Sequence, residues 1–201
     1  HQDDLASELA TANVGDVARD PATLARASHD ASLFELTPRA VVAPRNVRDV
    51  ERLVRFATTH DSVSLTARAA GTDMSGGWLT ESIVVSFTEH FTKIGRIAGD
   101  RVTVQPGVFY RDFERATLRH NLIVPSFPAS RQIATVGGMV ANNSGGELTL
   151  RYGQTARYVE SLKVVLADGV EHELKALNPR KLAAKLRRRD FEGMLYRTVH
   201  K

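Results

Sequence analysis

Two segments rich in glycine and small side chains constrain the fold more than any other feature of this sequence. They are residues 68–77, which read RAAGTDMSGG, and residues 128–146. Glycine accepts positive φ angles and lets the backbone approach another group closely. Consecutive N–H groups in such a loop can form a concave site for an anion. We therefore expect a scaffold of regular elements that presents two irregular loops, with a binding site at the loops.

The first segment follows a predicted strand, and its candidate binding residues are Arg68, Ala69, Ala70, Gly71, Thr72, Asp73, Ser75, Gly76 and Gly77. A pyrophosphate would fit, with the Thr72 and Ser75 hydroxyls as donors and Arg68 as a charge. Two familiar phosphate motifs are excluded. Trp78 follows Gly77 where a Walker loop needs Lys, and Gly71 and Gly76 are too far apart for the G-x-G-x-x-G fingerprint. By itself the segment is also compatible with a purely structural turn.

The second segment contains Gly137-Gly138 followed by Met139-Val140-Ala141, which predicts the start of a short helix. A helix start without a large side chain is a second place for a phosphate or a ring edge. Asn142, Asn143 and Ser144 follow, and they are polar but uncharged. Such residues suit a cofactor with amide-like edges and hydroxyl groups.

Hydrophobic spacing and turn residues predict an α+β fold. We expect helical pieces over residues 1–37, a helix capped by Asn46 that ends near residue 60, a helix over 109–120 and another after Asn178-Pro179. The expected strands are residues 40–43, 62–66, 83–87, 101–105 and 159–166, the last pairing with 171–174 through the turn at 167–169. This order predicts a small strand–helix–strand unit within residues 38–99. The start of a mixed or antiparallel sheet with helices follows over 100–174, and then a helical segment over 175–201.

Charge is distributed unevenly along the chain. Residues 175–201 carry nine Lys and Arg against two Asp and Glu, whereas residues 1–174 carry 18 against 21. A nucleic-acid or anionic-membrane patch is one reading of the basic segment, but it has no interleaved aromatic residues to stack on bases. We expect a solvated helix face and no nucleic-acid binding.

Cysteine is absent, which excludes disulfides and thiolate metal sites, and the histidines lack ligand spacing, so we expect no metal. The composition suits a cytoplasmic protein, with peripheral contact at the inner membrane face or with a redox partner as open alternatives.

A series of ordered motifs makes a family resemblance specific. They are residues 68–77 with Val104-Gln105-Pro106-Gly107, Pro128-x-Ser130, Thr135-Val136-Gly137-Gly138, Asn143-Ser144-Gly145-Gly146, Arg151-Tyr152-Gly153 and residues 164–169 (VVLADG). Together they resemble the FAD-binding domain of the vanillyl-alcohol oxidase and p-cresol methylhydroxylase superfamily, in the branch of the D-lactate and glycolate dehydrogenases. The resemblance covers about residues 38–174.

The resemblance implies a role for each motif. Residues 68–77 would wrap the FAD pyrophosphate, and Pro44 would pack near the adenine. The flavin side would be lined by Pro128, Thr135, Gly137 and Gly138. The ribityl and phosphate contacts would come from Asn142, Ser144, Gly145 and Gly146, and Gly153 would shape the adjoining turn. Family members usually have glycine in place of Ala69 and a hydroxyl residue in place of Asp73. Thr72 stands where the branches with covalent flavin carry His, so non-covalent FAD is expected.

The resemblance also implies a function, namely oxidation of a small 2-hydroxy acid by hydride transfer to FAD. Superfamily members continue into a further strand-rich stretch and a substrate-binding cap that this sequence does not contain. We therefore expect a truncated, inactive FAD-binding part whose substrate is held mainly elsewhere, and we assign no catalytic residue. Two alternatives stay open: a flavin-binding or interaction module without turnover, and a reductase of the same superfamily that acts on an enolpyruvyl group.

Overall fold

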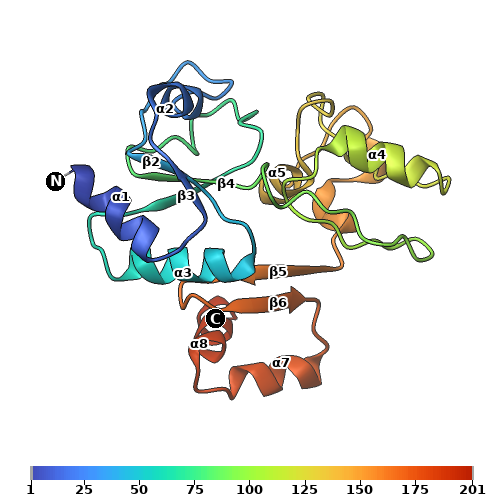
Figure 1. The fold of residues 1–201 in the computed structure, drawn as a ribbon. Coiled ribbons are helices and arrows are strands. Elements are labelled where there is room, and N and C mark those ends of the chain that lie inside the picture. The colour runs from blue at the N-terminus through green and yellow to red at the C-terminus, as the bar shows by residue number, and fades with distance from the viewer. Residues whose placement is uncertain (1, 201) are drawn as a thin grey trace.

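The computed structural model describes residues 2–200, and its chain divides into three regions (Figure 1). The first lobe, residues 2–87, contains a four-stranded sheet with helices. The second lobe, residues 94–158, contains short helices and long loops. The C-terminal region, residues 161–199, contains a β-hairpin and two helices. None of the helices in the described range is long and apolar enough to cross a membrane.

The first lobe is an α/β unit. Its elements are α1 (Gln2–Thr11), β1 (Asp16–Ala18), α2 (Pro21–Ala27), β2 (Ala40–Ala43), α3 (Val47–Thr58), β3 (Leu65–Arg68) and β4 (Ile83–Ser86). The strand order is β1-β2-β4-β3. β2 and β3 both run parallel to β4, with Ala40 and Leu65 each paired to Ile83, whereas β1 is antiparallel to β2. The carboxyl ends of the three parallel strands therefore meet at one edge of the sheet.

The sheet is covered on both faces, which explains why β2 and β4 are buried at every position and apolar except at Ser86. Ala40, Val42, Ile83 and Val85 point to one face and pack with residues from α1 and α3, namely Leu5, Leu9, Leu53 and Phe56. On the other face Val41 and Val84 pack with Ala27 of α2 and with Trp78. The first lobe thus has three layers, with α1 and α3 on one side and α2 on the other.

Helix α3 begins as its sequence predicts. The Asn46 side chain accepts hydrogen bonds from the backbone N–H groups of Arg48 and Asp49. The Asp49 carboxylate in the first turn is fully buried and forms ion pairs with Arg45, at 2.8 Å, and with Arg52. Burial alone would raise the pKa of Asp49, but hydrogen bonds and charge from Arg45, together with the charge of Arg52, hold that pKa below its usual range.

The second lobe has its own hydrophobic core. Its helices are α4 (Tyr110–Leu118), α5 (Val136–Ala141), α6 (Thr149–Tyr152) and the 3-10 helix η1 (Thr155–Tyr158). The core consists of Val108, Tyr110, Phe113, Phe127, Ala134 and Met139, and partly buried residues such as Ile94 and Leu148 pack against it. No residue of this core belongs to the cores of the first lobe, so the two lobes are packed separately.

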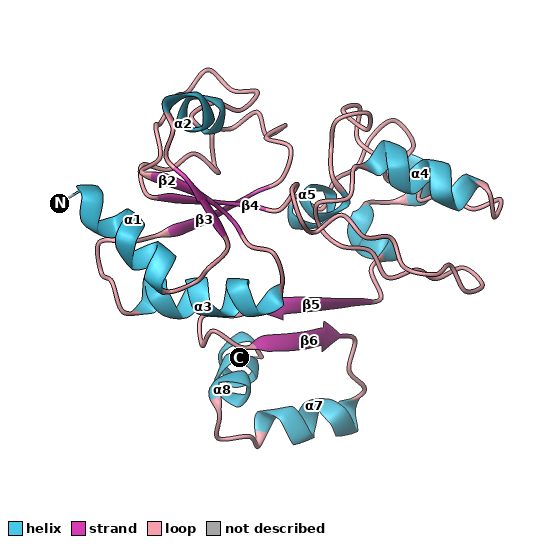
Figure 2. Ribbon diagram, viewed as in Figure 1, coloured by secondary structure: helices cyan, strands magenta, loops and turns pink. Residues whose placement is uncertain are grey.

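The prediction of a strand over residues 101–105 is wrong. The structure has only isolated bridges there, between Ile94 and Val104 and between Ala98 and Arg101. Figure 2 shows the segment between β4 and α4 as a loop. Val102 and Val104 alternate with polar residues because both valines pack against the core of the second lobe. They belong to no regular strand ladder.

The C-terminal region lies beneath α3 in Figure 1 and contains β5 (Ser161–Val165), β6 (Glu171–Lys175), α7 (Pro179–Leu186) and α8 (Phe191–Val199). β5 and β6 form the predicted antiparallel hairpin, and Gly169 in its turn has φ = +68°. The turn docks on α3, since the Arg55 guanidinium donates a 2.7 Å hydrogen bond to the Gly169 carbonyl. The Asn178 side chain caps α7, as predicted.

Candidate cofactor-binding site

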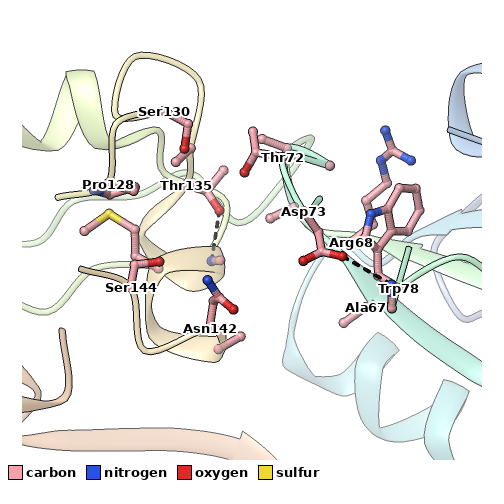
Figure 3. A pocket seen from close by; sticks show the side chains of 18 of the residues that line it. Ala67, Arg68, Thr72, Asp73, Trp78, Pro128, Ser130, Thr135, Asn142 and Ser144 are labelled. Atoms are coloured by element: carbon pink, nitrogen blue, oxygen red, sulfur yellow. Dashed lines mark hydrogen bonds between the residues drawn. The ribbon is translucent and has the colours of Figure 1, made fainter. Parts of the chain in front are cut away.

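A pocket of about 470 Å³ lies where the first loop, residues 68–77, faces the segment around α5 (Figure 3). One wall comes from the first lobe and includes Thr72, Asp73 and Trp78. The opposite wall comes from the second lobe and includes Pro128, Thr135, Asn142 and Ser144. Pockets of this size are typical of sites for small molecules and cofactors. The two glycine-rich segments are 50 residues apart in the sequence, and the fold brings them together.

Arg68 fixes the start of the first loop. It is the last residue of β3, and its guanidinium donates hydrogen bonds to the carbonyl oxygens of Ala27 and His29, at 3.3 and 3.1 Å. The guanidinium also lies over the Trp78 ring, 3.9 Å from the ring centre. Burial lowers the pKa of Arg68. In Figure 3 its side chain points away from the opposite wall, so its main contacts are with the protein behind the loop.

The conformation of the loop requires glycine at two positions. Gly71 has φ = +68°, and a methyl group there would lie 2.5 Å from a guanidinium nitrogen of Arg68. Gly76 has φ = +75°, and a methyl group there would lie 2.7 Å from the Phe34 ring. The loop is also tied to the segment before β2, because the Ala31 N–H donates to the Asp73 carbonyl at 2.9 Å.

The Asp73 carboxylate is hydrogen-bonded within the loop. Its Oδ2 atom accepts from the Ser75 hydroxyl at 2.6 Å, from the Ser75 backbone N–H at 3.0 Å and from the Gly77 backbone N–H at 3.2 Å. The hydroxyl bond and then the backbone bonds hold the pKa of Asp73 below its usual range, so the carboxylate is ionised at neutral pH.

On the opposite wall, Thr135 caps α5, and its hydroxyl accepts the Gly138 N–H at 3.1 Å. Gly137 turns toward the protein. Its N–H donates to the Pro106 carbonyl at 2.9 Å, and a methyl group on it would lie 2.4 Å from the Pro106 side chain. A methyl group on Gly138 would instead lie 3.3 Å from the Thr135 hydroxyl and 3.7 Å from Ala69 across the pocket.

A sharp turn after α5 presents Asn142 and Ser144 to the pocket. Asn143 adopts φ = +46°, and its side-chain oxygen accepts the Ala156 N–H at 2.9 Å. The Ser144 carbonyl accepts both the N–H and the hydroxyl of Thr155, at 2.9 and 2.8 Å. The buried Ser126 hydroxyl is also within 3.2 Å of the Thr155 hydroxyl. This network fixes the backbone of the turn.

Most of the residues predicted from the sequence do line this pocket: Arg68, Ala69, Ala70, Gly71, Thr72, Asp73, Ser75, Gly77, Pro128, Thr135, Gly138, Asn142 and Ser144. Six others do not line it: Pro44, Gly76, Gly137, Gly145, Gly146 and Gly153. Pro44 is buried directly after β2. Three of the glycines contact protein atoms closely, since a methyl group would meet Thr149 at Gly145, the Phe127 carbonyl at Gly146 and Arg157 at Gly153. The cofactor contacts assigned to these residues stay predictions.

Several lining residues were not predicted to bind the cofactor, namely Ala67, Trp78, Ser130, Ala134, Met139 and Ala141. Ala67 and Trp78 flank the first glycine-rich segment, residues 68–77. This adjacency is the sequence feature from which their place in the pocket could have been predicted. Ser130, Ala134, Met139 and Ala141 lie within the second segment. Their small or apolar side chains carry no signal that separates pocket residues from core residues.

The residues present fit FAD. The pocket walls are glycines, alanines and small polar residues, and Gly138 leaves open a space that a methyl group would fill. The lining residues include no His, Cys or Tyr, the side chains that could bond covalently to a flavin. Within the described range, no group of three or more His, Cys, Asp or Glu is arranged to hold a metal ion.

Comparisons with known proteins agree with this geometry. Residues 38–175 match the family described as FAD binding domain. The chain is 39% identical over 146 residues to glycolate oxidase subunit GlcD of Bacillus subtilis, covering 71% of this chain and 31% of that protein. It is 40% identical over 141 residues to D-lactate dehydrogenase of Archaeoglobus fulgidus, covering 67% of this chain and 31% of that protein. The match to D-2-hydroxyglutarate dehydrogenase of Escherichia coli is 30% identical and covers 92% of this chain and 19% of that protein.

Solved structures support the fold. Chitooligosaccharide oxidase superposes with a TM-score of 0.74 at 14% identity, covering 90% of this chain and 38% of that one. Alkyldihydroxyacetonephosphate synthase gives a TM-score of 0.70 at 21% identity, covering 83% and 33%. This chain spans about a third or less of the length of the curated relatives named above. The resemblance to the vanillyl-alcohol oxidase and p-cresol methylhydroxylase superfamily is confirmed, as is the α+β fold class. The chain belongs to the FAD binding domain family, and its cofactor is FAD.

Proposed function

We propose that this chain is the cofactor-holding part of a flavin-dependent oxidoreductase that oxidises a small 2-hydroxy acid. The observation that carries the proposal is the pocket that the two glycine-rich segments form together. Both segments lie inside the matched FAD-binding region. The three relatives compared above are named for glycolate, D-lactate and D-2-hydroxyglutarate, which are all 2-hydroxy acids. FAD supplies the hydride acceptor when bound.

The chain's own residues bind and orient the cofactor. Glycines and alanines let backbone N–H groups approach it, while Thr72, Ser130 and Asn142 offer uncharged hydrogen-bonding groups from both walls. A non-covalent site is part of the proposal, and it is supported by lining residues that include no His, Cys or Tyr. Pro44, Gly76 and the glycines that contact protein act indirectly in this proposal, by fixing the loops.

Substrate oxidation also needs a cation for the substrate carboxylate and a base for its hydroxyl proton. The ionisable residues of the pocket lining are Arg68 and Asp73, and both already have hydrogen-bond partners in the protein. We therefore propose that groups outside residues 1–201 hold the substrate and accept the proton. A cytoplasmic location, with contact to a redox partner or the membrane surface, is part of the same proposal.

The test compares two proteins: residues 1–201, and the product of the complete reading frame that encodes them. Each is saturated with FAD and mixed with D-lactate, glycolate or D-2-hydroxyglutarate in the absence of oxygen, and the flavin absorbance near 450 nm is followed. We expect one of these acids to bleach the flavin in the complete product and none to bleach it in residues 1–201.

The outcomes separate the alternatives. Flavin that dithionite reduces but no 2-hydroxy acid bleaches would contradict the substrate class. Bleaching by NADPH, with turnover of an enolpyruvyl substrate, would favour the reductase. Bound flavin that no substrate reduces in the complete product would favour a module without turnover. Rapid bleaching in residues 1–201 alone would place the catalytic groups inside this chain.

A further inference from the structure

We propose that the Asp73 carboxylate is an internal competitor for the phosphate groups of FAD, so that this side chain lowers the affinity of the chain for its cofactor. The proposal rests on the cofactor-holding role proposed above. It concerns one side chain whose charge is opposite to the charge that a pyrophosphate site requires.

The first step is the geometry of the carboxylate. One oxygen, Oδ2, is surrounded by two backbone N–H groups and one hydroxyl, from Ser75 and Gly77, at 2.6 to 3.2 Å. Neighbouring loop N–H groups that converge on one negative oxygen form the kind of concave site that binds phosphate oxygens. Asp73, Ser75 and Gly77 all line the pocket. The carboxylate therefore satisfies donors of the loop that a bound phosphate would otherwise take.

The second step is the local charge. Among the residues lining the pocket, Arg68 is the one cation and Asp73 the one anion. The Arg68 guanidinium donates to the carbonyls of Ala27 and His29, and the carboxylates of Asp30 and Glu89 are close enough to act on it electrostatically. Its charge is thus partly compensated before any ligand binds. A pyrophosphate at the loop would meet an ionised carboxylate without a free cation beside it.

The third step is the freedom of the side chain to move. The loop backbone is held at Asp73 by the Ala31 N–H bond to the Asp73 carbonyl and after Asp73 by the close approach of Gly76 to Phe34. The hydrogen-bond partners of the carboxylate, Ser75 and Gly77, are exposed residues. Rotation of the Asp73 side chain therefore frees the Ser75 N–H group and leaves the Gly77 N–H with its longer bond to the Ser75 hydroxyl, at 3.3 Å, while the backbone bond at Asp73 stays in place. Cofactor binding requires this rotation, which costs the three hydrogen bonds.

The experiment measures FAD affinity directly. Trp78 is the single tryptophan of the chain, and it lines the pocket, so quenching of its fluorescence reports FAD binding. Asp73→Asn keeps a side-chain oxygen for the turn but removes the charge. Asp73→Ala removes both the charge and the competing oxygen. Asp61→Asn is the matched control, because it removes an equal charge from an exposed residue at the opposite end of β3. Riboflavin, which has no phosphate, is titrated in parallel.

We expect Asp73→Asn to bind FAD on the order of tenfold more tightly than the parent, a difference of about 1.4 kcal/mol. Asp73→Ala should bind at least as tightly as Asp73→Asn. The Asp61→Asn control and the riboflavin affinity should not change. Weaker or unchanged FAD binding in both Asp73 variants, with FAD bound by the parent, would overturn the competitor role and leave the proposed function intact. Failure of the parent and every variant to bind FAD would overturn both.

Discussion

Replacing each of the adjacent residues Gly137 and Gly138 by alanine tests the orientation of α5, because the two methyl groups point in different directions. At Gly137 the methyl group would lie 2.4 and 2.7 Å from the Cβ and Cα atoms of Pro106, and 2.7 Å from its carbonyl oxygen. Carbon atoms in contact are normally about 3.5–4.0 Å apart. Pro106 and α5 must then separate, which also strains the 2.9 Å bond from the Gly137 N–H to the Pro106 carbonyl.

Overpacking of this kind costs about 1–3 kcal/mol. For a chain of this length each kcal/mol lowers the melting temperature by about 2–4 °C, so Gly137→Ala should melt roughly 2–12 °C below the parent. At Gly138 the nearest atom is the Thr135 hydroxyl, at 3.3 Å. Alanine is favoured over glycine inside a helix by about 0.8–1.0 kcal/mol. Gly138→Ala should therefore melt at or slightly above the temperature of the parent.

The two substitutions should affect FAD affinity in the opposite order, with the larger loss in Gly138→Ala. The methyl group at Gly138 projects toward Ala69 across the pocket, 3.7 Å away, and narrows the space between the two walls. We expect Gly138→Ala to bind FAD roughly tenfold more weakly, a loss of about 1.4 kcal/mol. The assays are thermal unfolding followed by circular dichroism and FAD titration followed by Trp78 fluorescence. Equal melting temperatures for the two variants, or a larger loss in Gly138→Ala, would refute the orientation. Unchanged FAD affinity in Gly138→Ala would show that the cofactor does not contact this wall.

Three further predictions concern the elements that carry the site. Asp49→Asn should lose roughly 1–3 kcal/mol of unfolding free energy at pH 7. Because the pKa of Asp49 is lowered, its contribution is present above about pH 4 and is lost at more acidic pH, so the variant should show a flatter pH dependence there in urea unfolding. Thr135→Val should cost about 1 kcal/mol in the same assay by removing the cap on the Gly138 N–H, and an unchanged midpoint would contradict that role. Gly169→Ala combines positive φ with a methyl group 2.4 Å from the Arg55 side chain, so about 1–3 kcal/mol should be lost, and hydrogen exchange in β5 and β6 should accelerate.

Elements with strong local signals could be predicted from the sequence. Asn46 and Asn178 both cap helices in the structure, because a capping side chain bonds to N–H groups only two or three residues away. The strand at residues 40–43 and the hairpin around Gly169 are also confirmed. The strand predicted at 62–66 lies at 65–68. Its register is set by pairing with β4, which a local pattern does not contain.

The sequence could not reveal features that depend on distant contacts. β1 has three residues, and its pairing to Val41–Ala43 decides that it is a strand. The segments α6 and η1 were also missed, and the helical segment predicted over 175–201 is divided into α7 and α8. Within the site, glycine signals a place where a side chain does not fit, but it does not say what occupies the space. The space beside Gly138 belongs to the pocket, whereas Pro106 fills the space beside Gly137.

The separate hydrophobic cores of the two lobes determine how a bound molecule can leave. One pocket wall rests on the sheet of the first lobe, and the other rests on the core around Tyr110 and Phe127. Since the cores share no residues, the walls can part while each lobe stays folded, at a cost below that of global unfolding. We therefore expect the dissociation rate of FAD to follow the frequency of this opening. A mutation at the contact between the lobes should shorten the residence time of the cofactor even when it touches no atom of the cofactor.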